Sequence, residues 1–395
     1  MVDEDKGPIR ILHVLGGMTW GGVETWLLHV LRHIDRERFH MDFLVHTDQP
    51  CPHDDEVRAL GGAIIPCLDP SRPWLYARNF NRIMREHGPY DVVHSHVHHY
   101  SGYVLLLAGR AGVPVRLAHS HNDTSRNEAR AGMLRRRYLK VMEQWIHRYA
   151  TGGLAASRAA ALDLFGPEWA EDARWRVLHY AVDLDGLRAT VEPNSARAEL
   201  GIPADAFVIG HAGRFAEQKN HAFLVDIAAA VAARDANARV LLVGDGPLLP
   251  DIERQVARTG LADRVVFVGA RYDVPRLMQG AMDVFLLPSF YEGLPVALIE
   301  AQALGLPCVY SDVVTEEADA VARLVRRVSL SQPPSVWADT ILAVRDAAQV
   351  TGRRDALGYL EKTSFDIRTS IGRLERIYAG RGLVELAREP ILQRA

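Results

Sequence analysis

Cysteine is scarce in this chain, and the few cysteines stand far apart. Only 3 of the 395 residues are cysteine, and they are Cys51, Cys67 and Cys308. No two of them have the C-x-x-C spacing that zinc and redox motifs use. The sequence therefore shows no zinc or redox motif, and a reducing compartment fits it best.

Long hydrophobic runs and a strong net charge are also missing. The longest nearly apolar run, residues 103–108, is far too short to span a membrane. The sequence starts M-V-D-E-D-K-G-P, which is acidic and polar and argues against a signal peptide. A formal net charge of −3 argues against nucleic acid as a partner, because nucleic-acid binders are basic. We therefore expect a cytoplasmic protein.

What is present is ordinary globular sequence arranged in two halves. A length of 395 residues predicts two domains of about 180 residues each. Strand-like apolar runs alternate with helical segments, which predicts an α/β protein with doubly wound parallel sheets. The predicted strands are 9–15, 41–47, 62–66, 91–94, 115–119 and 153–156, the last of the first half, and then 207–210, 239–243, 265–269, 283–287 and 309–312.

The segment 288–312, P-S-F-Y-E-G-L-P-V-A-L-I-E-A-Q-A-L-G-L-P-C-V-Y-S-D, carries the strongest signal. A buried strand ends before it, and Pro295 suits the first turn of a helix that stops at Gly305. Glu292 therefore falls in a loop at the carboxyl end of a strand, and Glu300 inside the helix. Ligands bind at this edge of an α/β sheet, and a helix N-terminus attracts anions. On spacing alone, a capping Glu292 and a solvated Glu300 are the alternative.

Two other loops after predicted strands suit phosphate binding. Residues 16–25, G-G-M-T-W-G-G-V-E-T, form a glycine-rich turn into a helix, although a plain tight turn is the alternative. The loop lacks the G-x-G-x-x-G spacing of nicotinamide enzymes. In residues 211–221, H-A-G-R-F-A-E-Q-K-N-H, Arg214 and Lys219 suit a diphosphate; surface ion pairing is the alternative.

Histidines follow two of the predicted strands, and a basic segment follows the second. The histidines are His94, His96, His98, His99, His119 and His121. Alternate histidines on an extended chain share a face, which is compatible with a metal site, but no carboxylate or cysteine in the sequence completes it. Structural histidines are the alternative. The basic segment, residues 126–148, predicts either an ordinary surface helix or a patch for an anionic membrane or a lipid diphosphate. Its predicted apolar face is Leu134, Tyr138, Val141, Met142, Trp145 and Ile146.

These segments together resemble the retaining glycosyltransferases of family 4, over nearly the whole chain from Ile9 to Tyr378. Glu292 and Glu300 match the Glu-x7-Glu motif, and residues 211–221 are similar to the G-R-x-x-x-x-K segment. G-G-V-E-T and R-L-A-H-S-H-N look most like the exopolysaccharide and capsule branch. The resemblance implies the GT-B fold, two Rossmann-like doubly wound parallel-sheet domains facing an interdomain cleft.

Domain limits follow from the same resemblance. The N-terminal, acceptor-side domain is expected at residues 1–182 and the nucleotide-sugar-binding domain at 183–365. A C-terminal helix in 366–395 is expected to cross back to the first domain.

The activity that the resemblance implies is hexosyl transfer with retention, without a metal or another cofactor. The donor would be a nucleoside diphosphate sugar, UDP-sugar first, and the acceptor a hydroxyl of a glycan or of a polyprenyl-diphosphate-linked glycan. Arg214 and Lys219 would neutralise the leaving diphosphate. The sequence leaves open the sugar, the base and the acceptor.

The resemblance also implies roles for further residues. Glu292 would position the donor sugar, and Glu300 would bind the ribose. His119, with His121 as the alternative, would lie beside the sugar. The other donor-binding residues that it implies are Gly21, Gly22, Gly244, Arg271, Gly293 and Leu294.

Two other functions remain alternatives, a UDP-sugar 2-epimerase of related fold and a non-catalytic sugar-nucleotide-binding protein. Through residues 126–148 the protein would be peripheral at the inner face of the cell membrane.

Overall fold

The computed structural model describes residues 7–124, 132–189, 191–192, 195–348 and 354–380. The chain divides into two compact units, the first comprising Met1–Tyr180 with Ile367–Ala395 and the second Ala181–Asp366. The predicted boundaries fall after residues 182 and 365, and those of the structure after Tyr180 and Asp366.

The first unit is built on a parallel sheet with strand order β3-β2-β1-β4-β5-β6-β7. Its strands are β1 (Ile9–Leu15), β2 (Phe39–Val45), β3 (Ile64–Pro66), β4 (Val92–Ser95), β5 (Val115–Ser120), β6 (Gly152–Ala155) and β7 (Trp175–Val177). The order reverses between β1 and β4, so the loops after these two strands diverge at the carboxyl edge, where α/β sheets bind ligands.

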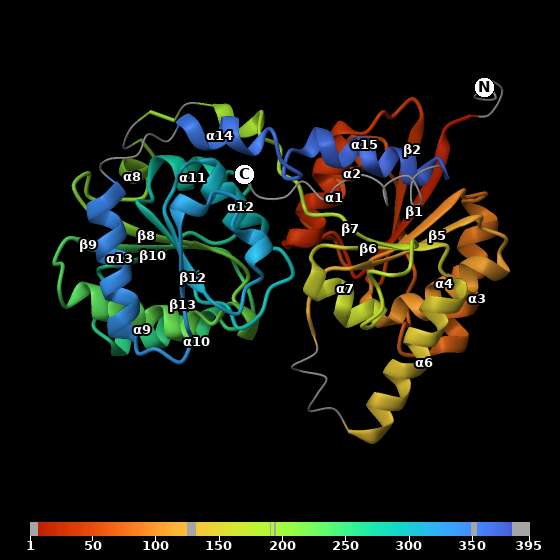
Figure 1. The fold of residues 1–395 in the computed structure, drawn as a ribbon, viewed down its shortest axis with the longest axis horizontal. Helices are drawn as coiled ribbons and strands as arrows, with labels where there is room; N and C mark the ends of the chain where they lie inside the picture. The colour runs from red at the N-terminus through yellow and green to blue at the C-terminus, as the bar shows by residue number, and fades with distance from the viewer. Residues whose placement is uncertain (1–6, 125–131, 190, 193–194, 349–353, 381–395) are drawn as a thin grey trace. The chain divides into compact units, whose positions relative to one another are not determined.

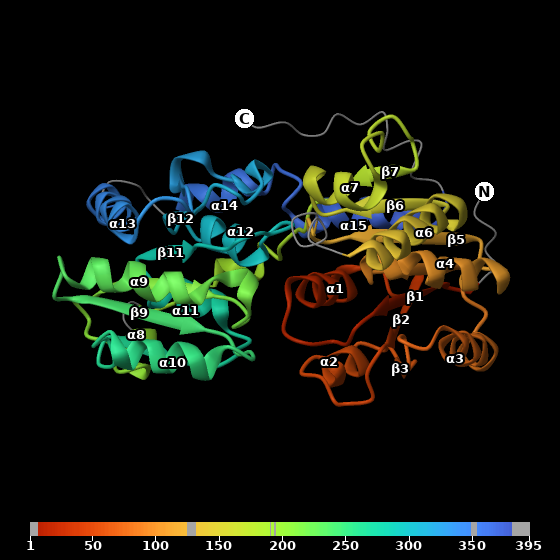
Figure 2. The ribbon, with the colours of Figure 1, turned by 90° about the horizontal axis from the view of Figure 1, so that it is seen from below.

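Helices cover both faces of this sheet (Figure 1). On one face lie α1 (Gly22–His33), α2 (Asp54–Ala59) and α15 (Ile367–Tyr378), of which α15 packs on α1. On the other face α3 (Pro73–Glu86), α4 (Ser101–Arg110), α6 (Met133–Tyr149) and α7 (Arg158–Phe165) follow one another in this order, as Figure 2 shows. The C-terminal helix α15 is thus part of the first unit, although the second unit precedes it in the sequence.

The second unit has a parallel sheet of order β10-β9-β8-β11-β12-β13. Its strands are β8 (Phe207–Ala212), β9 (Ala238–Val243), β10 (Val265–Phe267), β11 (Val284–Leu287), β12 (Cys308–Ser311) and β13 (Val325–Val328). Helices α9 (His221–Ala232), α10 (Leu249–Arg258) and α13 (Pro334–Ala348) cover one face, and α8 (Ser195–Glu199), α11 (Val274–Gly280), α12 (Val296–Ala303) and α14 (Arg354–Leu360) the other (Figure 1). Here the order reverses between β8 and β11.

Two strands were missed by the sequence analysis, and both lie at a sheet edge. Strand β7 pairs only with β6, so the predicted strand 153–156 is not the last of its half. Its residues W-R-V were not predicted as a strand, because three residues show no alternation. Strand β13 reads V-R-R-V, and two arginines in four residues hide the apolar pattern. Strands of three or four residues are too short for sequence periodicity to identify them reliably.

Each sheet is buried by its own apolar core. The inward-facing side chains include Phe165 and Trp175, whose rings stack with centroids 4.5 Å apart in the first unit. Phe215 and Trp337 are fully buried in the second. Among the described residues, no helix has both the length and the apolar character needed to cross a membrane.

Candidate functional site

In the second unit, the loop that carries Lys219 and the loop that carries Glu292 lie together where the strand order reverses. Strands β8 and β11 are neighbours, so the loops that follow them lie together at the carboxyl edge. The Phe290 amide donates to the Gln218 carbonyl at 2.9 Å, and the Asn220 side chain donates to the Pro288 carbonyl at 3.1 Å. These backbone contacts fix the Glu292 loop against the Lys219 loop.

Glu292 is held by two side chains of the facing loop. Lys219 Nζ lies 2.6 Å from Glu292 Oε1, and Gln218 Nε2 donates to Glu292 Oε2 at 3.1 Å. Glu292 is only 7% exposed. The capping alternative is therefore wrong for Glu292, because its partners are side chains of another loop and Pro295 is the residue that precedes α12. Next to it, Gly293 and Leu294 are buried.

Arg214 stands apart from this ion pair. Arg214 is exposed, and its guanidinium makes no hydrogen bond or ion pair within the part of the chain that the structure describes. Beneath it, the loops after β8 and β9 touch through glycines. A Cβ on Gly244, whose φ is +143°, would lie 2.1 Å from the Gly213 carbonyl oxygen, so only glycine fits there. The structure thus offers one cation engaged with a carboxylate and one facing solvent.

Glu300 is buried on α12 without a counter-charge. It is 9% exposed, and its carboxylate accepts no hydrogen bond from the described residues. Burial raises the pKa of Glu300 from its ordinary value of 4.5 to about 7. The solvated-helix alternative is therefore wrong for Glu300. A buried carboxyl with no partner has the capacity to accept hydrogen bonds from a ligand's hydroxyls.

Arg271, which the resemblance assigns to donor binding, forms ion pairs with acidic neighbours. Its guanidinium contacts Asp273 at 2.7 Å and Glu199 at 3.0 Å, and Arg276 shares both carboxylates. The hydrogen bonds that Arg271 donates, chiefly those to Asp273, raise its pKa. The arrangement is a structural ion-pair network after β10.

In the first unit, Gly21 and Gly22 begin α1 as predicted for the glycine-rich turn. Gly21 is the residue before α1, and Gly22 is the first residue of the helix. The Cβ of any other residue at position 21 would meet the Glu24 carboxylate at 2.3 Å. The N-terminus of α1 therefore opens at the carboxyl edge of β1.

Histidines from β1, β4 and β5 form a buried cluster at that edge. His13 belongs to it and was not among the predicted residues. The ring-nitrogen contacts are His13 Nδ1 to His96 Nε2 at 2.9 Å, His96 Nδ1 to His121 Nε2 at 2.9 Å, His94 Nε2 to His119 Nδ1 at 3.1 Å, His121 Nδ1 to the Tyr180 hydroxyl, and His94 Nδ1 to the Tyr378 hydroxyl at 3.0 Å. These contacts join the side chains into two hydrogen-bonded chains, Tyr378–His94–His119 and Tyr180–His121–His96–His13.

Three groups in the described residues have donor atoms close enough for a metal ion, namely His13 with His94 and His96, His96 with His119 and His121, and His98 with His99 and Asp163. The third contains a carboxylate that sequence analysis did not place there. Asp163 Oδ2 lies 3.0 Å from His98 Nε2 and accepts hydrogen bonds from the amide and hydroxyl of Thr124. The contacts with His98 and Thr124 account for the position of the Asp163 carboxylate.

Comparison with known proteins identifies the family. The model described as Glycosyltransferase Family 4 matches residues 20–185, and that described as Glycosyl transferases group 1 matches residues 206–345. EpsF of Bacillus subtilis (strain 168), assigned as a glycosyltransferase, is 39% identical over 373 residues, which cover 93% of this chain and 96% of EpsF. The chain belongs to glycosyltransferase family 4. It is a glycosyltransferase enzyme.

This family 4 chain is also similar to more distant proteins, in sequence and in structure. The UDP-Gal:alpha-D-GlcNAc-diphosphoundecaprenol alpha-1,3-galactosyltransferase of Escherichia coli is 25% identical over 328 residues, 77% of this chain and 80% of that enzyme. The crystal structure of Anabaena HepE in complex with UDP and glucose superposes with a TM-score of 0.77 at 20% identity, covering 94% of this chain and 100% of HepE. The predicted GT-B fold, with two Rossmann-like units, is confirmed.

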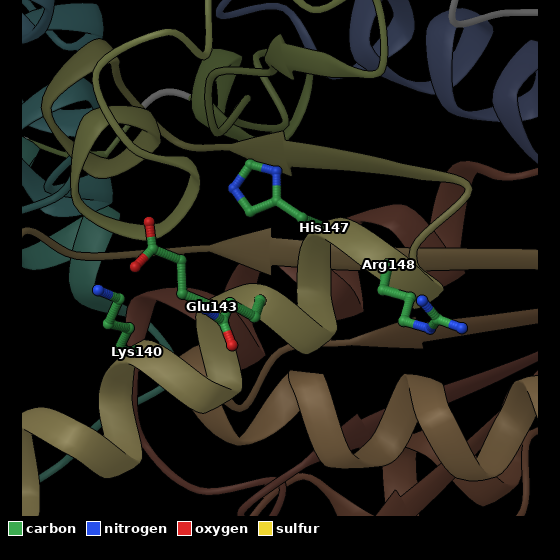
Figure 3. A pocket seen from close by; sticks show the side chains of 5 residues that line it. Lys140, Glu143, His147 and Arg148 are labelled. Carbon is green, nitrogen blue, oxygen red and sulfur yellow. The ribbon is translucent and has the colours of Figure 1, made fainter.

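A hollow of about 520 Å³ lies elsewhere on the first unit of the family 4 chain. It is lined by one helix alone, through Lys140, Glu143, Gln144, His147 and Arg148 of α6. Figure 3 shows the Lys140 and Glu143 side chains on one side of it and Arg148 pointing the other way. None of the predicted donor-binding residues lines this hollow, and all its residues belong to the basic segment 126–148, of which 126–131 lie outside the described residues.

Sequence analysis missed the residues that support the site. Gln218 stands directly before Lys219, but a lone glutamine in a loop gives no signal of its contact with Glu292. Tyr378 reaches His94 from 284 residues away. Only the register of the strands and the packing of α15 bring these side chains together.

Proposed function

We propose that this glycosyltransferase moves a sugar from a UDP-sugar to a hydroxyl of a glycan or lipid-diphosphate-linked glycan during polysaccharide synthesis, with retention and without a metal. The observation that carries the proposal is the assembly of Lys219 and Gln218 on Glu292 at the edge where β8 and β11 diverge. The relatives that bind UDP or use UDP-galactose support the choice of donor.

Each part of the donor has a chemical counterpart in the second unit. Arg214 and Lys219 would carry the negative charge that the diphosphate gains as the glycosidic bond breaks. Glu292 and the amides around Gly293 would accept and donate hydrogen bonds to the sugar hydroxyls. Glu300 would accept hydrogen bonds from the ribose. Retention fits front-face attack in which the donor phosphate receives the acceptor's proton, so no protein nucleophile is required.

The test uses Arg214 because its substitution removes no hydrogen bond or ion pair among the described residues. Wild type is mixed with UDP-, GDP- and ADP-sugars and lipid-diphosphate acceptors, and nucleotide release and product mass are measured. We expect acceptor-dependent UDP release, retained anomeric configuration by NMR, and no loss on chelation. Arg214→Ala should lower kcat by about 10²-fold or more, as for loss of one charge-stabilising group.

The matched control is Arg258→Ala, another exposed arginine of the same unit. Epimerisation of the UDP-sugar without release of free UDP would favour the 2-epimerase alternative. Donor binding without turnover for every acceptor would favour the non-catalytic alternative. An Arg214→Ala enzyme as active as Arg258→Ala would contradict the assignment of the diphosphate site.

We also propose that the N-terminal turns of α6 contact an anionic membrane surface. The predicted apolar face is wrong at this end, because Leu134 is 86% exposed and Tyr138 is also exposed. The first buried residue of α6 is Leu139. Met133 and Leu134 therefore project beside Arg135, Arg136 and Arg137, which combines apolar anchors with charges attracted to anionic lipid.

Sedimentation with phosphatidylglycerol vesicles tests this contact. We expect the wild type to bind them, and to bind less as salt is raised. The Met133→Ser/Leu134→Ser variant should lose most of the binding, whereas Leu162→Ser, which alters an exposed leucine on α7, should not. Equal binding by both variants, or binding to neutral phosphatidylcholine vesicles alone, would contradict the proposal.

A further inference from the structure

His94 bridges the C-terminal helix and His119 through its two ring nitrogens. Its Nδ1 lies 3.0 Å from the Tyr378 hydroxyl of α15, and its Nε2 lies 3.1 Å from His119 Nδ1. The two imidazole rings are nearly parallel, with an interplanar angle of 6°. All three side chains belong to the first unit, so the chain Tyr378–His94–His119 does not depend on the second.

Both imidazoles in this chain are neutral. Burial, and then the neighbouring histidines, lower the pKa of His94 and of His119 well below the ordinary value of 6.5. A neutral imidazole carries one proton, so one nitrogen donates and the other accepts. The chain therefore has two arrangements, in which every hydrogen bond points toward His119 or every one points toward Tyr378.

The environment of Tyr378 selects between them. Its hydroxyl is buried beneath α15, and its only hydrogen-bond partner among the described residues is His94 Nδ1. If the chain pointed toward Tyr378, this O–H would have no acceptor, whether or not a ligand was bound. If the hydrogen bonds are donated toward His119, the donor left without an acceptor is the Nε2–H of His119. This atom has no partner in the described residues. That atom is at the carboxyl end of β5, where a ligand can complete it.

We propose that Tyr378 fixes the tautomer of His119 through His94, so that His119 carries its proton on Nε2 and offers a hydrogen-bond donor to the ligand. Tyr378 donates to His94 Nδ1, and His94 Nε2–H donates to His119 Nδ1. His94 and Tyr378 are positioning residues, since they act through His119. If the proposed function holds, the partner of His119 Nε2–H is an oxygen of the sugar or the diphosphate.

The other hydrogen-bonded chain, Tyr180–His121–His96–His13, distinguishes His119 from His121. His121 uses Nδ1 with Tyr180 and Nε2 with His96, so both of its ring nitrogens are occupied inside the first unit. His119 keeps Nε2. Of the two histidines that the sequence left as alternatives, His119 is therefore the one with hydrogen-bonding capacity for a ligand.

The tautomer can be measured without any transfer assay, by long-range ¹H–¹⁵N correlation on protein labelled with ¹⁵N-histidine. Such spectra distinguish a protonated ring nitrogen from a bare one, and His119→Gln assigns the signals. We expect a protonated Nε2 on His119 in the wild type. Tyr378→Phe should lose it wholly or in part, because His94 Nδ1 no longer has a donor. Tyr103→Phe is the control, since that hydroxyl donates to the Pro73 carbonyl outside the chain.

Two variants of His94 separate the tautomer from simple packing. His94→Gln retains an N–H donor for His119 Nδ1 and should keep Nε2 protonated, whereas His94→Leu should not. With the donor substrate, we expect Tyr378→Phe to raise KM about fivefold, the effect of one neutral hydrogen bond, with kcat changed less.

A bare His119 Nε2 in the wild type, or the same tautomer in Tyr378→Phe and wild type, would overturn the proposal. So would histidine signals that shift together on adding one equivalent of Zn²⁺, which would indicate a metal site in the cluster. Because the spectra need no substrate, an inactive enzyme with the expected tautomer would contradict only the proposed function.

Discussion

Replacing Lys219 by methionine is expected to lower kcat about 10²–10³-fold and to destabilise the second unit by about 3–5 kcal/mol. Both effects follow from the ion pair, because Lys219 Nζ lies 2.6 Å from a buried Glu292 carboxylate. Without the ammonium, the Gln218 amide is the remaining side-chain partner of Glu292 among the described residues. The leaving diphosphate would also lose one of the two cations proposed to bind it. Steady-state kinetics and urea denaturation measure the two losses separately.

A double variant separates catalysis from folding. In Lys219→Met/Glu292→Gln the buried charge is gone, so stability should largely return while kcat stays low. Lys362→Met, an exposed lysine of the same unit, is the control and should change neither. If the double variant regained wild-type transfer, Lys219 would serve only to neutralise Glu292. If Lys219→Met kept its kcat, the proposed diphosphate site would be wrong.

The local architecture around Glu292 and Glu300 was predictable because each signal is local. An apolar run gives β11, Pro295 precedes α12, and Gly305 has the positive φ of +69° expected after a helix. The ion pair itself was not predictable. Its two residues are 73 positions apart, and they meet because β8 and β11 are hydrogen-bonded neighbours in the sheet.

The error on α6 has a similar physical cause. Helical periodicity shows which residues share a face, but it does not show how far the partner helix extends. Helix α6 has 17 residues and its partner α4 has 10; at 1.5 Å per residue, the shorter helix leaves about 10 Å of the longer one uncovered. The apolar residues in that uncovered part, Met133 and Leu134, are exposed. These two exposed side chains are the proposed apolar anchors in the membrane surface.

Replacing Glu300 by glutamine is expected to stabilise the ligand-free protein above pH 7 and to weaken its binding of UDP. Burial raises the pKa of Glu300 from 4.5 to about 7, so the folded protein holds this proton more tightly than the unfolded chain does. The stability that the protonated Glu300 carboxyl contributes is fully present below pH 4.5 and is lost as the pH rises through 7. The free energy of unfolding falls by about 3 kcal/mol over this range, at about 1.36 kcal/mol per pKa unit. A glutamine at position 300 does not titrate, so the variant avoids this decrease.

Binding of UDP should show the opposite pH dependence. An ionised carboxylate accepts hydrogen bonds from both ribose hydroxyls, so wild-type affinity should rise about tenfold between pH 6 and pH 8. Glu300→Gln should bind weakly and without this rise. Glu253→Gln, an exposed glutamate on α10, should match wild type in both urea denaturation and calorimetry. A carboxyl that destabilises the ligand-free fold at neutral pH, yet strengthens nucleotide binding, is retained for binding. If Glu300→Gln gained no stability and bound UDP as tightly as wild type at pH 8, the ribose assignment would fail.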